Sequence, residues 1–413
     1  MSQLVQFTKE EVFEYHRKNR GKISLNLKTP LRDKKELSLA YTPGVGEICK
    51  AIEKNKNEIY KYTNVENTVA VISDGTAVLG FGDIGPHAAM PVMEGKCVLF
   101  KALAGVDAIP ICLGTKIPEK IIDIVKSLEP TFSGINLEDI SAPNCFTIEN
   151  RLKNEMNIPI FHDDQHGTAV VLFGGLINAL KFVNKKIEDI KIVINGAGAA
   201  GCAIAKMLLE SCAKDVILCD REGIIYKGRK SGMNPFKDDI ANVTNKENIS
   251  GSLKDAIKSS DVFIGVSVAN VVTPQMIESM NTDSIVFALA NPTPEIMPDI
   301  AKKAGAKIVG TGRSDFPNQV NNVMGFPGIF RGTLDVRAKE INDDMKLAAA
   351  RAISEVIQYE ELHEEYIISS PLNPKIVPSV AFSVAKSAIK TNVARIRLSD
   401  EELREKIKKN ITV

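Results

Sequence analysis

Two pairs of adjacent acidic residues close short apolar segments in the first half of the chain. Glu138-Asp139 ends FSGINLED, and Asp163-Asp164 ends NIPIFHDD. Ligands gather at the carboxyl ends of parallel strands, and clustered carboxylates repel one another unless a cation neutralises them. Because oxygen-rich sites suit Mg²⁺ or Mn²⁺, the pairs predict a divalent metal site. Helix capping is the alternative, and on an extended strand one acid of each pair at most would face the ion unless the backbone turns there.

Two histidines, His162 and His166, bracket the second acid pair. A site that contains histidine would favour zinc or iron over magnesium. The seven cysteines form no C-x-x-C pair, and no other pattern in the chain supports such a site. We therefore expect hydrogen-bonding or packing roles for both histidines.

A lysine lies among apolar residues in the helical segment PVMEGKCVLFKALA. The residues three and four positions from Lys96 are Val92, Met93, Leu99 and Phe100. Burial there would lower the pKa of the amine and make it a candidate general base. The alternative is a buried stem with the charge in water, and Lys101 on the same helix has equally apolar neighbours. The pattern does not distinguish the two lysines.

Four further polar residues are candidates for contact with a ligand. Tyr41 precedes a proline–glycine turn in LAYTPGVGE, where a tyrosine can donate a proton or simply pack. Asn291 in ALANPTPE ends an apolar segment of the second half, and Asn321-Asn322 lies in QVNNVMGFPG. Asparagine at such places orients polar ligands or forms turns, and the spacing leaves both readings open.

A glycine-rich turn in the second half carries the fingerprint of a dinucleotide site. It follows the apolar segment KIVIN, opens the helical segment AIAKMLLES, and consists of Gly196, Ala197, Gly198, Ala199, Ala200 and Gly201. In such turns glycine permits a tight bend, close approach to a pyrophosphate and close helix–strand packing. Asp220 ends the next apolar segment, where an acid can bind the ribose 2′-hydroxyl. Arg221 is adjacent and could bind a 2′-phosphate, so the pattern predicts NAD or NADP without choosing between them.

The elements that must position these residues form an α/β protein. From 191 to 310 short apolar segments alternate with helical ones, which predicts a Rossmann-type, doubly wound parallel sheet. We expect an N-terminal α/β substrate domain over 1–160, the dinucleotide domain over 161–390 and a helical tail over 391–413. Within the first domain, two apolar runs flank Asp74-Gly75 in residues 68–83, which predicts a hairpin. Thr8 is expected to cap a helix over 8–20.

Composition excludes several classes of protein. The chain has 413 residues, 52 Lys+Arg against 51 Asp+Glu, and 44% hydrophobic residues, so it is an ordinary globular protein with no basic field for nucleic acid. No apolar run reaches the ~18 residues of a membrane span. The first twenty residues contain acids and no apolar core segment, unlike a secretory signal. The odd number of cysteines is typical of reduced thiols, and we expect a cytoplasmic protein.

Taken together, these motifs resemble the malic enzymes of the short, bacterial type from about residue 20 to 395. The resemblance is carried by the following blocks: SLAYTPGVGEICK, VAVISDGTAVLGFGDIGPHAAMPVMEGKCVLFKALAGVD, NLEDISAPNCF, FHDDQHGTAVV, INGAGAAG, ALANPTPEI and QVNNVMGFPGIFRG. It implies oxidative decarboxylation of L-malate to pyruvate and CO₂ with reduction of NAD or NADP, decarboxylation of oxaloacetate, and a homodimer with a small-molecule substrate.

The resemblance also implies roles for individual residues. Tyr41 becomes the catalytic acid and Lys96 the base, supported by Asp163. The divalent metal falls to Glu138, Asp139 and Asp164. Asn291 and Asn322 become contacts of the substrate or nicotinamide, and Asn321 is a further candidate for such a contact. Longer, animal-type malic enzymes carry a malate-binding arginine where this chain has Ala77, so the substrate carboxylate must be recognised by other groups.

Three alternative functions use parts of the same pattern. A redox-neutral decarboxylase would convert malate to lactate, or oxaloacetate to pyruvate, at the same site. An amino-acid dehydrogenase also pairs a Rossmann domain with a catalytic lysine, but it needs no carboxylate set. A dinucleotide-binding regulator would bind NAD(P)H without turnover.

Overall fold

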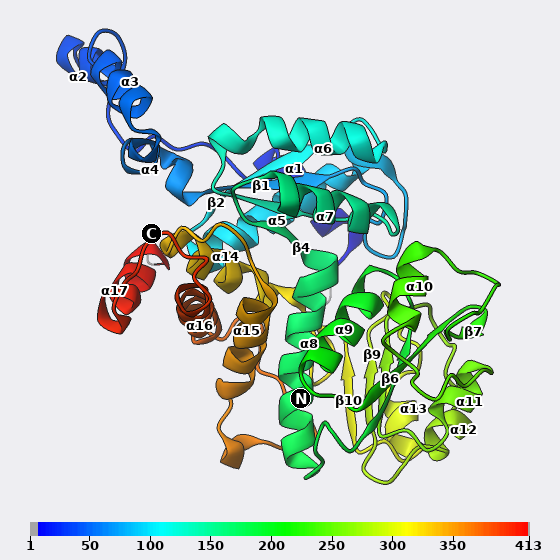
Figure 1. Cartoon of the computed structure of the whole chain (residues 1–413). Helices are drawn as coiled ribbons and strands as arrows, with labels where there is room; N and C mark the ends of the chain where they lie inside the picture. The colour runs from blue at the N-terminus through cyan, green and yellow to red at the C-terminus, as the bar shows by residue number, and fades with distance from the viewer. Residues whose placement is uncertain (1–6, 412–413) are drawn as a thin grey trace.

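The computed structural model describes residues 7–411, and it contains two mainly parallel β-sheets with helices around them (Figure 1). The first sheet is parallel throughout. In spatial order its strands are β2 (Asp107–Cys112), β1 (Thr68–Ser73), β3 (Gly134–Leu137) and β4 (Ile160–His162). Residues 1–6 and 412–413, which belong to the expected N-terminal domain and C-terminal tail, lie outside the described residues.

Helices cover both faces of this first sheet. On one side α5 (Gly85–Ala104) packs against β1 and β2, and on the other lie α6 (Pro118–Ser127) and α7 (Asn144–Glu155). Every side chain of β1 is therefore buried, which accounts for its continuous apolar run. Alternate residues serve different cores, since Val69 and Val71 face α5 while Ala70 and Ile72 join the cluster with α6 and α7.

The predicted hairpin over 68–83 is wrong. Strand β1 pairs in parallel with β2 and β3, and the only antiparallel contact within this segment is an isolated bridge between Val78 and Gly82. Gly75 has φ +71°, and an added Cβ would collide with the backbone of Gly85. The Asp-Gly signal therefore marks a close crossing of the chain over the start of α5.

The second sheet is the predicted Rossmann-type sheet. In spatial order its strands are β10 (Ile308–Thr311), β9 (Ile285–Ala288), β8 (Val262–Gly265), β5 (Lys191–Asn195), β6 (Asp215–Asp220) and β7 (Gly223–Ile224). Only β7 is antiparallel. Strand order reverses beside β5, and ligands of such sheets bind at that point, outside the carboxyl ends of the strands. The apolar segments expected between 191 and 310 are thus confirmed as strands.

One long helix joins the two sheets. Helix α8 (Asp163–Phe182) begins at the end of β4 and packs against α9 (Ala199–Glu210), whose first turn contains the last residues of the dinucleotide fingerprint (Figure 1). The remaining helices of this lobe are short: α10 (Pro235–Ala241), α11 (Leu253–Ile257), α12 (Pro274–Glu278) and α13 (Pro298–Lys303). The expected domain boundary at 160 falls just before α8 and stays a prediction.

The C-terminal part is helical, as expected. Its helices are α14 (Phe326–Asp335), α15 (Asp343–Glu355), α16 (Ile376–Lys390) and α17 (Asp400–Ile411). Helix α15 packs on α8, while α14 and α17 reach α5. One continuous hydrophobic cluster runs from the α5 face of the first sheet through these helices to the second sheet. Short 3₁₀ turns complete the described chain: η1 (Lys56–Glu58), η2 (Asn64–Asn67), η3 (Glu129–Thr131), η4 (Asn322–Met324) and η5 (Tyr359–Glu361).

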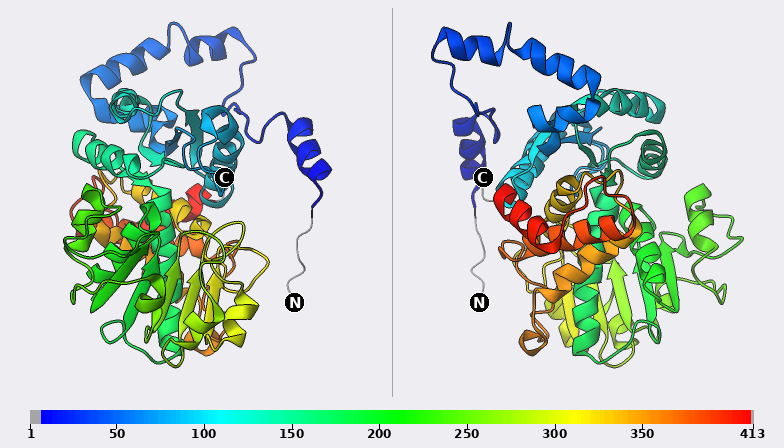
Figure 2. Two further views of the ribbon diagram at one scale, coloured as in Figure 1. Left: turned by 90° about the vertical axis from the view of Figure 1, so that its right-hand side faces the viewer. Right: turned by 60° about the vertical axis from the view of Figure 1, so that its left-hand side comes forward.

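The N-terminal part before β1 has no core of its own. It contains α1 (Lys9–Asn19), α2 (Lys34–Ala40), α3 (Val45–Lys54) and α4 (Ile59–Tyr62), and no residue from 7 to 64 is buried. Thr8 caps α1 as expected. Helices α2 and α3 project beyond the first sheet at the margin of the molecule in all views (Figures 1 and 2). We call residues 23–64 the arm.

Candidate functional site

Three acids from two neighbouring strand ends converge on one point. Glu138 and Asp139 follow β3, Asp164 lies in the first turn of α8 after β4, and β3 and β4 are paired in parallel. One carboxylate oxygen of each acid lies within 4.8 Å of one oxygen of the other two. This spacing fits a single hard cation with oxygen ligands.

A turn of the backbone lets both acids of the first pair contribute. Asp139 has φ +54°, so the chain leaves the extended conformation immediately after Glu138. The Asp139 N–H donates a hydrogen bond to Asp164 Oδ2 at 2.8 Å. The backbone turn that we named as the exception to the one-acid limit is therefore present at the first pair.

Lys96 lies inside this group of acids. Its side chain is 7% exposed, its Nζ lies 2.9 Å from Glu138 Oε1, and it forms an ion pair with Asp163. The ammonium group also lies 4.0 Å from the centre of the Phe326 ring. Lys101, which the sequence could not separate from Lys96, is half-exposed and pairs with Asp107 outside the group. We call Lys96, Glu138, Asp139, Asp163 and Asp164 the lysine–carboxylate group.

Gly167 makes room for Asp163 within its own helix. Asp163 is completely buried in the first turn of α8, and a Cβ on Gly167 would overlap its carboxylate. The Asp163 carboxylate can therefore lie against the next turn of its own helix, where it pairs with Lys96. His162, and not Asp163, occupies the N-cap position of α8, and no side-chain cap bond is made there. Neither Asp163 nor Asp164 therefore caps α8, so the helix-capping alternative is wrong for this pair.

The charge balance in the group favours a bound cation. Burial and the charges of Asp164 and Glu138 raise the pKa of Asp139 to about 9, and burial raises the pKa values of Glu138 and Asp164 as well. Asp139 Oδ2 and Asp163 Oδ1 are buried without a hydrogen-bond partner. These orphaned oxygens and the mutual repulsion of the acids fit a divalent ion held by Glu138, Asp139 and Asp164.

The pKa of Lys96 is raised, whereas the sequence predicted that burial would lower it. Burial lowers the pKa of its amine, but the charges of Asp163 and Glu138 outweigh burial, so the pKa lies above its ordinary value. The sequence argument considered only the apolar neighbours on the same helix. The acids that reverse the shift come from other elements.

The two asparagines of QVNN differ in what they contact. Asn322 lies at the start of η4, and its Nδ2 donates to Asp163 Oδ2, so it joins the lysine–carboxylate group. Asn321 caps the same turn, with its Oδ1 accepting from the Val323 N–H at 3.1 Å. The turn-forming alternative therefore describes Asn321, while Asn322 contacts Asp163 and its role towards a ligand stays a prediction.

The histidines take the structural roles that we expected. His166 Nε2 lies 2.9 Å from Glu149 Oε1, and burial lowers the pKa of the ring to about 3. His162 is completely buried, its Nε2 lies 3.6 Å from Asp164 Oδ2, and burial lowers its pKa too. Among residues 7–411, Glu138, Asp139 and Asp164 form the one cluster that could hold a metal, and it contains neither histidine.

Tyr41 does not reach the lysine–carboxylate group. It is the C-cap residue of α2 on the arm and is 69% exposed. Within the described chain, no tyrosine hydroxyl is hydrogen-bonded to Lys96 or to the surrounding acids. The structure thus separates the two residues to which the family resemblance assigns proton transfer.

The glycine fingerprint has the geometry of a phosphate cradle. Gly196 has φ +122°, and a Cβ there would meet the Val266 carbonyl; a Cβ on Gly201 would meet the carbonyl of Gly196. By contrast, the space around Gly198 is open within 4 Å. Ala199 and Ala200 begin α9, so their N–H groups face the turn. A cavity of about 900 Å³ lies against this turn, lined also by Asp220 and Arg221.

Asp220 is less available than its sequence position implied. It accepts hydrogen bonds from Arg229 and Lys237, the latter at 2.6 Å. Burial opposes its ionisation, but these bonds outweigh burial and lower its pKa to about 2. Arg221 is 91% exposed at the cavity. A ribose would therefore meet an acid already shared between two cations, with the exposed guanidinium of Arg221 beside it, 3.9 Å from Glu222 Oε1.

Asn291 lies where the two lobes meet. It is exposed at the loop after β9, and its carbonyl lies against Gly80 of the first lobe, where a Cβ would collide with it. Ala77, in the same loop as Gly80, donates its N–H to the Asp139 carbonyl at 3.0 Å. The loop after β1 therefore connects the candidate metal ligands of one lobe with the dinucleotide lobe.

Comparison with known proteins accounts for both lobes. The family model for the malic enzyme N-terminal domain matches residues 20–153, and that for the malic enzyme NAD-binding domain matches residues 165–391. The chain is 57% identical to the bifunctional malic/malolactic enzyme of Bacillus subtilis over 97% of its own length and 98% of the relative's. The chain belongs to the malic enzyme family.

Solved malic enzymes share this fold. The structure of malic enzyme from Pyrococcus horikoshii superimposes with a TM-score of 0.93 at 49% identity, covering 98% of this chain and 96% of that one. The NAD-dependent malic enzyme of Thermotoga maritima gives 0.88 at 49% identity, covering 92% and 99%. Membership of the malic enzyme family makes this chain a decarboxylating malate oxidoreductase that uses NAD or NADP.

Sequence reasoning missed the buried polar network behind the malic enzyme site. Glu149 on α7 accepts from Gln165 at 3.0 Å and from the backbone N–H of His162, and pairs with Lys153 at 2.7 Å. Glu149 therefore bonds to the residues on both sides of the second acid pair, His162 before it and Gln165 after it. The sequence of α7 around Glu149 forms no recognisable motif. The one clue is that the partners of Glu149 lie beside Asp163 and Asp164 in the chain.

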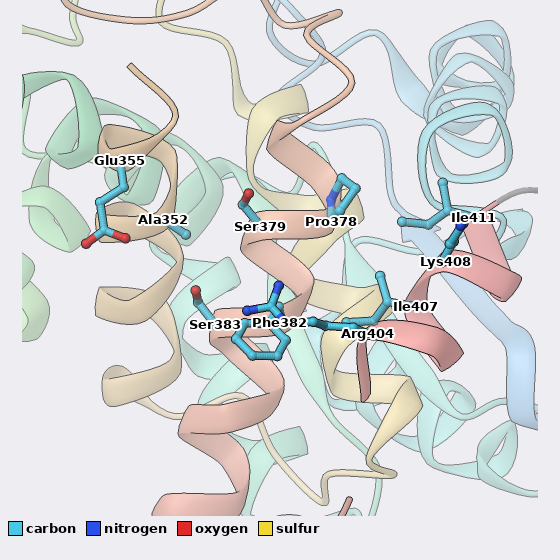
Figure 3. A pocket seen from close by; sticks show the side chains of 10 residues that line it. All are labelled: Ala352, Glu355, Pro378, Ser379, Phe382, Ser383, Arg404, Ile407, Lys408 and Ile411. Carbon is cyan, nitrogen blue, oxygen red and sulfur yellow. The ribbon is translucent and has the colours of Figure 1, made fainter. Parts of the chain in front are cut away.

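A second cavity lies outside the malic enzyme site. It measures about 680 Å³ and lies between α15, α16 and α17 (Figure 3). Its lining includes Arg404, whose guanidinium lies 3.9 Å from the centre of the Phe382 ring, and Glu355. None of the candidate site residues lines it.

The helices of residues 7–411 include none that combines the length and the apolar character of a membrane span.

Proposed function

We propose that this malic enzyme family member oxidises and decarboxylates L-malate to pyruvate and CO₂ with reduction of NAD⁺ or NADP⁺, at the lysine–carboxylate group, and that it also decarboxylates oxaloacetate. The observation that carries the proposal is a buried amine within 2.9 Å of a carboxylate set suited to a divalent ion. The loop bearing Ala77 and Gly80 connects this group to the dinucleotide lobe.

In this proposal Lys96 accepts the C2 hydroxyl proton of malate. The amine must first be neutral, and its protonated form is held by Asp163 and Glu138. A cation held by Glu138 would weaken that carboxylate's hold on the ammonium. Burial would then favour the neutral amine, opposed by the Phe326 ring, which favours the charged form. Asp163 then receives or returns the proton through its direct contact with Nζ, and Asn322 holds the same Asp163 oxygen.

Glu138, Asp139 and Asp164 are the proposed ligands of Mg²⁺ or Mn²⁺. When bound, the ion supplies Lewis-acid polarisation of substrate oxygens, which favours loss of CO₂. The Asp139 N–H bond to Asp164 keeps the two sides of the ligand set together. Because Ala77 offers no cationic side chain, backbone amides and Asn322 are the proposed contacts of the second substrate carboxylate.

Gly196, Gly198, Ala199, Ala200 and Gly201 form the proposed pyrophosphate site, with Asn291 at the nicotinamide end. Asp220 and Arg221 lie at the proposed ribose end. Tyr41 is the proposed donor of the proton that converts the enol of pyruvate to pyruvate. We also propose a cytoplasmic location, which the seven unpaired cysteines of the chain support.

A malolactic reaction is the second candidate. It would yield lactate and CO₂ from malate with no net change in the nicotinamide, and a relative with 57% identity is named a bifunctional malic/malolactic enzyme. The same lysine and acids would serve both reactions, because each begins with oxidation at C2 and loss of CO₂.

The test is malate with Mn²⁺ and either NAD⁺ or NADP⁺, with reduced nucleotide, pyruvate and lactate followed together. We expect pyruvate and reduced nucleotide in equal amounts and complete loss of both when a chelator removes the metal. Lactate without net reduced nucleotide would favour the malolactic reaction. Dinucleotide binding without any product would contradict both proposals.

A further inference from the structure

A buried carboxylate lies directly behind the wall of the dinucleotide cavity. Glu295 lies in the loop after β9 and is completely buried. Its Oε1 accepts hydrogen bonds from the Ser267 N–H at 2.7 Å and the Ser267 hydroxyl at 3.2 Å, and its Oε2 accepts one from the Ala290 N–H at 3.0 Å. Ser267 lines the cavity. Glu295 therefore ties the loop after β8 to the loop after β9 at the carboxyl edge of the second sheet.

The hydrogen bonds of this carboxylate are those of an anion. Its three partner groups all donate, and Asn195 Nδ2 donates to the Ser267 hydroxyl at 2.8 Å, which leaves the hydroxyl proton to point at Glu295. Within residues 7–411, no lysine, arginine or histidine pairs with Glu295. Burial raises its pKa despite the hydrogen bonds, because they do not fully replace its hydration. Glu295 is thus a buried negative charge without a positive partner.

Backbone contacts fix the place of this charge. Gly265 ends β8, and a Cβ there would collide with the carboxyl carbon of Glu295. The Asn270 N–H donates to the Pro294 carbonyl and the Val272 N–H to the Glu295 carbonyl, both at 3.1 Å. The carboxylate therefore lies against the end of β8, and the loop that carries it has no freedom to turn it towards solvent.

The carboxylate is on the nicotinamide side of the proposed dinucleotide site. A dinucleotide lies across the point where the strand order reverses, which is beside β5 in this sheet. Asp220 at the end of β6 marks the ribose of the adenosine half, so the nicotinamide half belongs over β8 and β9. Asn291, the proposed nicotinamide contact, is in the same loop as Glu295.

We propose that the buried carboxylate of Glu295 stabilises the oxidised nicotinamide, whose ring is positively charged, and gives no such stabilisation to the neutral ring of the reduced cofactor. The inference rests on the proposed function, because it requires a nicotinamide dinucleotide in this cavity. An uncompensated buried charge is costly, and the oxidised ring supplies the missing positive charge. Glu295 is a positioning residue, since the loops that it ties together form the wall between it and the cofactor.

Binding of three probes in the absence of malate tests the inference. They are NAD⁺, NADH and benzamide adenine dinucleotide, in which a neutral ring replaces the nicotinamide of NAD⁺; the 2′-phosphorylated forms of all three are used if NADP⁺ binds better than NAD⁺. We expect the wild type to bind NAD⁺ roughly tenfold more tightly than the benzamide analogue.

Glu295→Gln removes the charge. It should weaken NAD⁺ binding by about tenfold and change the binding of NADH and the benzamide analogue by less than about twofold. Glu278→Gln, at an exposed position on α12 in the same lobe, is the matched control and should leave all three affinities unchanged. Equal weakening of the three probes by Glu295→Gln would show that Glu295 only holds the loops and would overturn the inference, as would three unchanged affinities.

Two further measurements keep the test independent of how well Glu295→Gln folds, because its amide cannot accept from all three donors. Ser267→Ala loses one hydrogen bond to Glu295 but keeps the charge, so we expect it to retain the preference for NAD⁺ over the benzamide analogue. Loss of that preference in Ser267→Ala would overturn the inference. Equal affinity of the wild type for NAD⁺ and the analogue would do so without any variant.

Malate oxidation by the same wild-type preparation separates the two proposals. A wild type that oxidises malate but binds NAD⁺ and the benzamide analogue equally refutes only the role of Glu295. A wild type that binds NAD⁺ and fails to oxidise malate refutes the proposed function, and the role of Glu295 is then decided by the binding ratios. A wild type that binds none of the probes refutes both.

Discussion

Lys96 and Tyr41 are the two proton-transferring residues of the proposed reaction, and their surroundings differ in most physical respects. Lys96 is 7% exposed and is held by Glu138, Asp163 and the Phe326 ring. Tyr41 is 69% exposed at the end of a short helix in a segment with no buried residue. Residues of the same chain surround Lys96, whereas most of the Tyr41 side chain faces solvent.

The difference teaches how each residue should respond to change. A buried amine among carboxylates contributes to both catalysis and stability, because its removal leaves buried acids unpaired. A tyrosine that is 69% exposed on the arm contributes little packing to its own chain. Substitutions in the two regions should therefore separate effects on turnover from effects on folding.

The largest effect is expected from Lys96→Ala. Loss of the general base should lower kcat by ~10²–10⁴-fold, and the unpaired acids should also lower the thermal midpoint unless Mn²⁺ is present. Steady-state kinetics with malate and thermal unfolding measure the two effects. Lys101→Ala, on the same helix but paired with Asp107 at the surface, is the control and should retain near wild-type kcat. A loss below about fivefold in Lys96→Ala would remove this residue from its proposed role.

Tyr41→Phe should show the catalytic loss without the folding loss. We expect kcat to fall by at least ~100-fold while NAD(P) affinity and the thermal midpoint stay unchanged, because the hydroxyl makes no hydrogen bond to residues 7–411 of its own chain. Nucleotide titration and calorimetry measure the unchanged properties. Tyr62→Phe, another exposed tyrosine of the arm, serves as the control. A folding defect equal to that of Lys96→Ala would contradict the contrast drawn above.

Asp164→Asn should weaken the metal site while leaving Lys96 in place. Removal of one ligand charge should raise the half-saturating Mn²⁺ concentration by at least ~10-fold. Mn²⁺ should also raise the thermal midpoint of the wild type, since it binds the folded state, and should do so less in the variant. Asp123→Asn on the exposed face of α6 controls for a change of surface charge. An unchanged Mn²⁺ requirement would contradict the proposed ligand set.

Gly167→Ala should give the smallest effect, confined to the buried region. The added Cβ must displace the Asp163 carboxylate, and overpacking of this kind costs about 1–3 kcal/mol. Urea unfolding measures the loss of stability, and a lower kcat should accompany it because Asp163 holds Lys96. Thr168→Ala, one residue further along α8, should change stability by less than about 1 kcal/mol. If Gly167→Ala matches it, the packing of Asp163 has been misjudged.

Local patterns predicted the dinucleotide lobe well because its determinants are local. Each strand from β5 to β10 that we expected carries its own apolar run, and the fingerprint lies between a strand and a helix that adjoin it in the chain. The hairpin over 68–83 failed for the opposite reason. Strand β1 finds its partners in β2 and β3, and the Asp-Gly pair gave no information about those long-range pairings.

The candidate site was predictable as a set of residues but not as an electrostatic unit. The acid pairs pointed to a metal, yet the backbone turn at Asp139 that brings both acids together has no signature in the sequence. The direction of the Lys96 pKa depends on Asp163, which lies 67 positions away in the chain. Asp220 shows the same limitation, because Arg229 and Lys237 engage it after folding.

Helix α8 makes the spacing between chemistry and cofactor a matter of helical geometry. It begins with Asp163 and Asp164, continues without a break for 20 residues and packs on α9 behind the glycine turn. A rod of this length spans about 30 Å and turns by about 100° per residue. A single residue inserted midway would rotate one end against the other by about 100°, so the length of α8 is constrained in a way that the length of a flexible loop is not.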